Sequence, residues 1–227
     1  MKLFLSLLLG VCLLVPAQSF SQDLKQVSIG PYLGYRAGVS TVVTPQGRKN
    51  GVGFNNIPEF GLTSYFPLTS QANIGIATEL GYSTYSYLMI SGRQDATEYK
   101  LSHSYLTINP NFFFRGFFIG VNIGLPMASD YDGTEIKTSK QETIAELKVG
   151  GMIPIYQDES GELNLVIMGG YFLSGIYKDF VKNDPMKDIL LTDEPVTKIF
   201  NPRPASLMVG FNFLFNLSKS QEEVFDE

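Results

Sequence analysis

The stretch Val27–Ser40, VSIGPYLGYRAGVS, alternates between two unlike sets of side chains. Its odd positions are mostly apolar, as at Ile29, Leu33 and Val39, whereas its even positions carry Ser, Gly, Tyr and Arg. Successive side chains of a β-strand point to opposite faces, so this period of two predicts a strand with one apolar face and one small or polar face.

The same alternation returns seven more times along the chain. The eight predicted strands cover residues 27–40, 54–66, 73–88, 103–114, 117–127, 144–155, 163–174 and 205–217. Each is longer than the about five or six residues that are common in globular proteins. Each is also long enough to cross a bilayer at a tilt, which takes about 9–11 residues.

The connections between these strands alternate in length. Long connections are expected at residues 41–53, 89–102, 128–143 and 177–204, and short ones at residues 67–72, 115–116 and 156–162. Long loops at one end and short turns at the other are typical of membrane β-barrels. An even number of strands brings both ends of the chain to the side of the short turns, which is the periplasmic side in such barrels.

The distribution of charge separates a membrane barrel from a soluble, lipocalin-like barrel, which also has eight alternating strands. The chain has 17 Lys and Arg residues, 22 Asp and Glu residues and a formal net charge of −5. The predicted strands contain few of these charges, namely Arg36, Glu59, Glu79, Glu146 and Lys148. A surface in water carries roughly 25–35% charged residues, so neither face of these strands suits a soluble exterior. The sequence therefore predicts an all-β, eight-stranded antiparallel up-and-down transmembrane β-barrel with its apolar face towards lipid.

Three prolines and a group of phenylalanines refine this prediction. Pro31, Pro58 and Pro110 cannot donate to a strand ladder, so we expect bulges or shifted strand boundaries there. The phenylalanines fall near the turn side of the apolar face, at Phe66, Phe112, Phe114, Phe117, Phe213 and Phe215. They predict a periplasmic aromatic girdle, and the alternative interpretation is a hydrophobic core cluster.

The two ends of the chain differ from the barrel. An apolar run, Leu3–Val15, follows Lys2 and precedes the small residues Ala17, Ser19 and Ser21. The run is shorter than the roughly 20 residues of a transmembrane helix, so we expect a Sec-type signal peptide over residues 1–21. The barrel then occupies residues 22–217, and residues 218–227 form an acidic periplasmic tail. The expected location is the bacterial outer membrane.

The five charges of the strands are predicted to point into the lumen. Buried charges need partners, so we expect a lumen network in which Arg36 pairs with Glu59 and Glu79 on the next two strands, joined by Glu146 and Lys148. Such a network is either part of a gated ion path or a structural filling of the lumen. An eight-stranded barrel is only just wide enough for side chains to fill it, which favours the structural interpretation.

The chain has one histidine, His103, which is the main candidate for catalysis. Barrel enzymes that modify lipid A pair a His with a Ser, and acyl transfer needs a carboxylate to orient the ring. Ser102 and Ser104 adjoin His103 and would point to the opposite face of the strand, while the position two residues on is Tyr105. We therefore expect no enzymatic activity and no catalytic residues.

A short acidic segment, Ser129–Glu135, raises the question of a metal site. Asp130, Asp132 and Glu135 surround Gly133 and could bind a hard cation such as Ca²⁺. The full pattern of an EF-hand loop is absent, so we expect a solvated loop, no metal and no cofactor. No basic stripe exists to neutralise phosphates, so nucleic acid is not an expected partner.

The last predicted strand resembles the β-signal of bacterial outer-membrane proteins. The sequence GFNFLF supplies the matching residues Gly210, Phe213 and Phe215. Met208 occupies a position that is usually polar, and the chain continues beyond the strand instead of ending on an aromatic residue. The resemblance implies insertion by the outer-membrane assembly machinery.

The whole chain resembles the small outer-membrane β-barrels of Bacteroidota, the PorT-like family, and OmpA-like eight-stranded barrels. The likeness lies in the leader, in IGPYLGYRAGVS and in SYLTINPNFFFRG, where the PorT-like family more often has an IPLLLKY-like sequence. It implies an integral outer-membrane protein without specifying one activity. One hypothesis is a structural or surface-interaction barrel whose four loops meet lipopolysaccharide, surface proteins, host partners or a secretion-system protein. The other is a barrel that passes small solutes.

Overall fold

The computed structural model describes residues 27–42, 48–69, 73–91, 98–178 and 201–217, so the predicted signal peptide and acidic tail lie outside the described residues. The described part contains ten strands and a short 3₁₀ helix: β1 (Ser28–Ser40), β2 (Arg48–Phe54), β3 (Glu59–Pro67), β4 (Ile74–Ser91), β5 (Glu98–Phe114), β6 (Phe117–Tyr131), β7 (Thr134–Glu135), η1 (Thr138–Lys140), β8 (Ile144–Gln157), β9 (Gly161–Phe172) and β10 (Pro204–Asn216). Among these residues, no helix has the length and apolar character to cross a membrane.

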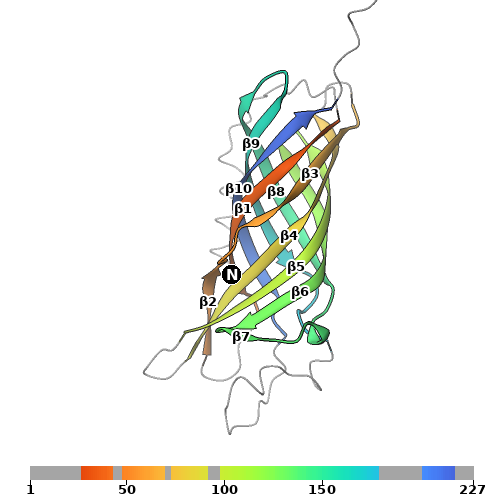
Figure 1. Ribbon diagram of the computed structural model, residues 1–227. Coiled ribbons are helices and arrows are strands. Elements are labelled where there is room, and N and C mark those ends of the chain that lie inside the picture. The colour runs from red at the N-terminus through yellow and green to blue at the C-terminus, as the bar shows by residue number, and fades with distance from the viewer. Residues whose placement is uncertain (1–26, 43–47, 70–72, 92–97, 179–200, 218–227) are drawn as a thin grey trace, which may run out of the picture.

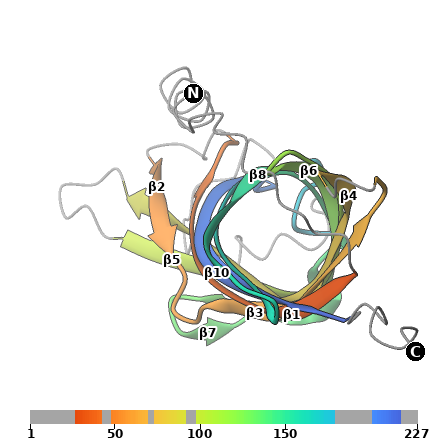
Figure 2. The same ribbon diagram turned by 90° about the horizontal axis from the view of Figure 1, so that it is seen from above.

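The strands close into a barrel (Figure 1, Figure 2). Around the ring of hydrogen bonds the order is β1, β3, β4, β5, β6, β8, β9, β10 and back to β1, and every neighbouring pair is antiparallel. The pairing of β1 with β10 closes the ring and runs from Ser28 opposite Asn216 to Ser40 opposite Pro204. The predicted eight-stranded antiparallel barrel is therefore confirmed over the described residues.

The two ends of the barrel differ in their connections. The turn end carries the short connections 68–73, 115–116 and 158–160, together with the N-terminal end of β1 and the C-terminal end of β10. The loop end carries the longer connections, and β7 and η1 lie there (Figure 1). Arg115 and Gly116 both have positive φ angles, 49° and 87°, as the two-residue turn of a tight hairpin requires.

The second strand of the wall corrects the prediction from the sequence. We expected a loop over residues 41–53 and one strand over residues 54–66, but residues 48–54 form β2 and β3 begins only at Glu59. Both strands pair with β4. β2 and β3 therefore occupy the same place in the barrel wall, with β2 on the loop side of β3. Residues 55–58 interrupt the strand, and the backbone N–H of Asn55 donates to the carbonyl oxygen of Arg36 at 3.1 Å.

The prolines affect the ladder less than expected. Pro58 lies directly before β3, as a shifted boundary. At Pro31 and Pro110 the pairing with one neighbouring strand is skipped, but the register continues unchanged, so the expected bulges are absent there. Irregular registers occur instead between Ser104 and Tyr105, where β5 faces Pro126, and after Pro154 in β8.

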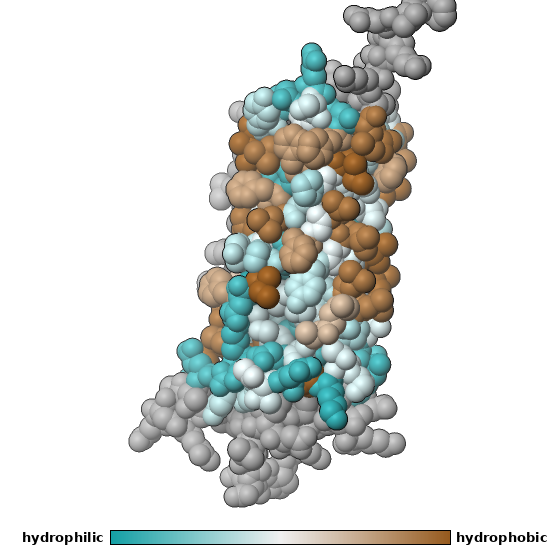
Figure 3. Space-filling view, viewed as in Figure 1, coloured by the Kyte–Doolittle hydropathy of each residue, from teal (hydrophilic) through white to brown (hydrophobic). Residues whose placement is uncertain are grey.

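The apolar face of the strands points outward, as predicted. Leu33, Leu62 and Ile119 are each about half exposed, whereas the alternate positions of the same strands are mostly covered. The exposed phenylalanines of the predicted girdle are Phe66, Phe112, Phe114, Phe117 and Phe215, and Phe213 is partly covered. Figure 3 shows hydrophobic residues (brown) over the middle of one face and hydrophilic residues (teal) at its two ends. This exterior matches a hydrocarbon surrounding and not water.

The glycines of the inner face provide space for large side chains from neighbouring strands. A methyl group at Gly61 would overlap the ring of Tyr32, and one at Gly81 would overlap the hydroxyl of the same residue. A methyl group at Gly170 would overlap the carboxylate of Glu146. The inner face therefore combines glycines with large residues, which is how side chains of full size fit into a narrow barrel.

We predict that Gly81→Ala destabilises the barrel by roughly 1–3 kcal/mol, because the added methyl group overpacks the inner face. The methyl group would overlap both the hydroxyl of Tyr32 and the carbonyl oxygen of Phe60. The measurement is guanidinium unfolding of the refolded protein in lipid vesicles. Gly151→Ala is the matched control, because its methyl group would lie no closer than 3.3 Å to the carbonyl oxygen of Gly116. Equal stability of the two variants would contradict this account of the inner glycines.

Candidate functional site

A layer of charged side chains crosses the middle of the bore. Arg36 of β1 binds Glu59 of β3 through two hydrogen bonds, from Nε to Oε1 and from Nη2 to Oε2, the second at 2.9 Å. Its Nη1 atom donates to Oε1 of Glu146 on β8 at 3.0 Å. Arg36, Glu59 and Glu146 are each no more than 1% exposed. One guanidinium thus joins carboxylates from two separate strands of the wall.

Neutral side chains complete the environment of Arg36 and Glu146. The hydroxyl of Tyr85 donates to Oε2 of Glu146, and the guanidinium of Arg36 lies 4.4 Å from the centre of the Tyr85 ring. Asn122 donates to Glu146 at 2.9 Å, and Ser206 accepts from Arg36 at 2.6 Å. Buried charges keep their ionised state only when hydrogen bonds replace water, and these contacts supply them.

The other two charges form a second, looser pair. Nζ of Lys148 lies 3.8 Å from Oε2 of Glu79, and that oxygen also accepts a hydrogen bond from Nδ2 of Asn109 at 2.6 Å. The structure thus brings all five predicted lumen charges into the bore, but the pairing differs from the expected one. Arg36 binds Glu59 and Glu146, whereas Glu79 is paired with Lys148.

Apolar side chains fill the bore on the turn side of this layer. The cluster consists of Tyr65, Ala77, Phe113, Phe118, Met152, Val166, Met168, Met208 and Leu214. Asn164 and Asn212 lie opposite each other in the register of β9 and β10 and are both buried among the strands. Glu162 is also buried here, and the sequence did not predict it because it precedes the expected strand by one residue.

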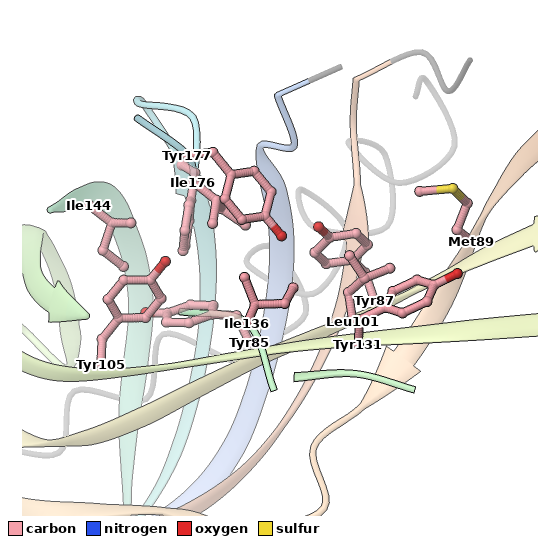
Figure 4. Packing of buried hydrophobic residues seen from close by; sticks show 11 residues of the cluster. Tyr85, Tyr87, Met89, Leu101, Tyr105, Tyr131, Ile136, Ile144, Ile176 and Tyr177 are labelled. Carbon is pink, nitrogen blue, oxygen red and sulfur yellow. The ribbon is translucent and has the colours of Figure 1, made fainter. Parts of the chain in front are cut away.

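A second cluster, rich in tyrosine, fills the loop end of the bore (Figure 4). It consists of Tyr85, Tyr87, Met89, Leu101, Tyr105, Tyr131, Ile136, Ile144, Phe172, Ile176 and Tyr177. The ring of Phe172 lies 4.7 Å from that of Tyr85 in an edge-to-face contact. Ile136, Ile176 and Tyr177 come from the connections at the loop end and close the cluster from outside.

His103 lies inside this end of the bore and is fully buried. Its Nδ1 atom lies 2.7 Å from Oγ of Ser129 on the neighbouring strand, a partner that the sequence did not predict. Nε2 lies 3.4 Å from the hydroxyl of Tyr87, and the ring contacts Tyr177 edge-on at 5.6 Å. The groups around the ring are hydroxyls and aromatic rings, and these hold the imidazole in place.

The acidic segment at residues 129–135 forms a hairpin. Tyr131 pairs with Thr134, and Asp132 and Gly133 have positive φ angles of 47° and 85°. Oδ1 of Asp130 accepts a hydrogen bond from the backbone N–H of Gly133 at 2.9 Å. Within the described residues, no group of three His, Cys, Asp or Glu side chains is arranged to hold a metal ion.

The residues of the assembly signal lie at the seam of the barrel. Gly210 of β10 faces Gly34 of β1, and both are inner positions. Phe213 and Phe215 lie on the outer face with their rings 4.6 Å apart. Their part in insertion stays a prediction.

We predict that Arg36→Met destabilises the folded barrel by about 3–5 kcal/mol, because it leaves two buried carboxylates without their cation. Adding Glu59→Gln and Glu146→Gln to the same chain should restore much of that loss. The measurement is again guanidinium unfolding in vesicles. Arg115→Met, the same change at an exposed turn residue, is the control and should alter stability by no more than about 0.5 kcal/mol. A triple variant as unstable as Arg36→Met alone would contradict the pairing described above.

Comparison with known proteins gives likenesses of fold only. No protein-family model matches the sequence, and no curated protein matches it at a significant level. Several solved structures resemble the chain. The outer-membrane protein OprG of Pseudomonas aeruginosa is 9% identical, with 84% of this chain and 97% of OprG covered and a TM-score of 0.38.

Two further solved structures are similar to the chain at the same level. Ail of Yersinia pestis, solved with the heparin analogue sucrose octasulfate, is 10% identical over 84% of this chain and 99% of its own, with a TM-score of 0.37. The outer-membrane protein AlkL, solved in lipid bilayers, is 14% identical over 87% of this chain and 94% of its own, with a TM-score of 0.41. At these scores the likenesses carry no argument about function, and the fold rests on the hydrogen-bonded ring of the chain itself.

Proposed function

We propose that this chain is an integral outer-membrane β-barrel with a closed bore and a structural or surface-interaction role. The observation that carries the proposal is the filling of the bore in three successive parts. An apolar cluster occupies the turn half, the charged layer around Arg36 crosses the middle, and the tyrosine-rich cluster occupies the loop end. An eight-stranded barrel filled in this way acts as a membrane-anchored scaffold for its loops.

The exterior and the topology support this placement. A closed ring satisfies the backbone hydrogen bonds that lipid cannot, and half-exposed aliphatic and aromatic side chains surround it. The N-terminal end of β1 and the C-terminal end of β10 meet at the turn end. In an outer-membrane barrel that end faces the periplasm, and the loop end faces the exterior. The proposed partners are lipopolysaccharide and a surface or secretion-system protein at the loop end, and the assembly machinery during insertion.

The competing function is a channel for small solutes, and conductance separates the two. We predict that the refolded protein in planar bilayers shows no stable open level, because charged side chains joined across the bore leave no path for hydrated ions. Co-flotation with lipid vesicles is the control that shows the protein to be inserted. A reproducible open state of appreciable conductance would replace the proposal with the channel.

An enzyme is the less favoured alternative, and the pair of His103 and Ser129 makes it worth testing. Both side chains are buried inside the barrel and away from its lipid face, where the acyl chains of lipid A lie. We therefore propose that the pair is structural. We predict that deleting the gene, or changing Ser129→Ala, leaves the mass spectrum of lipid A unchanged. An acyl-chain difference that returns to normal with the wild-type chain, but not with Ser129→Ala, would show enzymatic activity.

A further inference from the structure

Two loop segments at the loop end, residues 136–142 and 174–177, fold over the mouth of the bore, and we name them the mouth strap. They are joined to each other where Gln141 bridges Tyr177 and where the backbone N–H of Glu142 donates to the carbonyl oxygen of Ile176 at 2.7 Å. Asn201 reinforces the second segment, because it exchanges two hydrogen bonds with the backbone of Tyr177 at 3.1 and 3.0 Å. The two segments of the strap are therefore joined directly to each other.

The strap is joined to the barrel wall by buried apolar side chains and by a small number of backbone hydrogen bonds, not by a continuous ladder. The backbone N–H of Ile136 donates to the carbonyl oxygen of Ser129 at 2.8 Å, that of Ile176 donates to the carbonyl oxygen of Pro202 at 3.2 Å, and Oγ of Ser174 accepts from the backbone N–H of Ala145 at 3.3 Å. By contrast, β4 and β5 are joined without interruption from Ile74 opposite Phe114 to Ile90 opposite Glu98. Segments with few hydrogen bonds to their surroundings open far more often than continuous ladders do.

The closed strap also leaves buried polar atoms without partners. The side chain of Gln141 is fully buried, and neither its Nε2 nor its Oε1 atom has a hydrogen-bond partner among the described residues. The hydroxyl of Tyr105, on the wall of the same end of the bore, is in the same situation. Buried groups of this kind lose their bonds to water and gain nothing in return, so the closed position carries a penalty that hydration would remove.

The strap covers the aromatic residues at the loop end but not the charged layer. Tyr105, Phe172 and His103 lie under it and are fully buried while it is closed. The layer formed by Arg36, Glu59 and Glu146 lies deeper and shares no residue with the strap. Opening of the strap would therefore expose Tyr105, Phe172 and His103, which we name the aromatic cup. The charged layer would still close the bore beneath them.

We propose that the mouth strap is a lid, which opens transiently towards the loop side and exposes this aromatic cup while the charged layer stays in place. Opening hydrates Gln141 and Tyr105, and closing buries them again. The lid thus sets how often the interior of the loop end is accessible from outside.

Amide hydrogen exchange by NMR, on the full mature chain in detergent micelles, tests this proposal. The amides of Glu142 and Ile176 should exchange at least about a hundred times faster than those of Leu80 and Ile108 in the wall, which need wider unfolding. Gln141→Leu removes both unpartnered atoms of the strap and should slow the strap amides about tenfold or more without affecting the wall. Strap amides protected as strongly as the wall amides would overturn the proposal.

Two further variants keep the test decisive. Gln157→Leu, the same change at an exposed residue of the turn end, should leave the exchange of the strap unchanged. Tyr105→Phe removes the other unpartnered group with little change of shape and should slow the strap amides in the same direction as Gln141→Leu. Tyr105→Phe decides the question if Gln141→Leu does not fold. Faster or unaltered strap exchange in both folded variants would show that the strap is not held under this penalty.

Discussion

The hydrogen bonds between the first and last strands are the constraint on which the rest of the structure depends. In hydrocarbon no water can bind the free edge of a sheet, so β1 and β10 must pair along their length, from Ser28 opposite Asn216 to Ser40 opposite Pro204. Closure with eight wall positions fixes a bore that is little wider than side chains. The inner face then has to be assembled from glycines and large residues together, as Tyr32 with Gly61 and Gly81 illustrates.

The content of the bore follows from this narrowness. A charge in such a space cannot keep a full shell of water and must find its hydrogen bonds within the wall. Arg36 does so with Glu59, Glu146 and Ser206, which belong to three different strands. The layer is therefore a set of connections across the barrel that joins three strands of the wall, and in the proposed function the same connections close the bore.

The sequence predicted those parts of the fold that depend on one strand at a time. Alternation placed Arg36 and Leu33 on opposite faces of β1, because the face of a residue follows from its position alone. It missed β2, since the polar sequence RKNGVGF lacks the alternation of a strand that lies against lipid. It also missed the contact of His103 with Ser129. Counting back from the turn at Arg115 and Gly116 would place Ala128 opposite His103, but the irregular register at Ser104 and Tyr105 shifts the partner to Ser129.

The charged layer also favours the native register of the strands over shifted registers. Arg36 belongs to the first strand and Ser206 to the last, so their contact exists only after the two ends of the sheet have met. A shift of β1 by a single residue would turn its inner side chains outward. The guanidinium would then face acyl chains, and Glu59 and Glu146 would lose their shared cation. Fidelity of assembly is thus encoded in the interior, where an error of one residue carries a large electrostatic penalty.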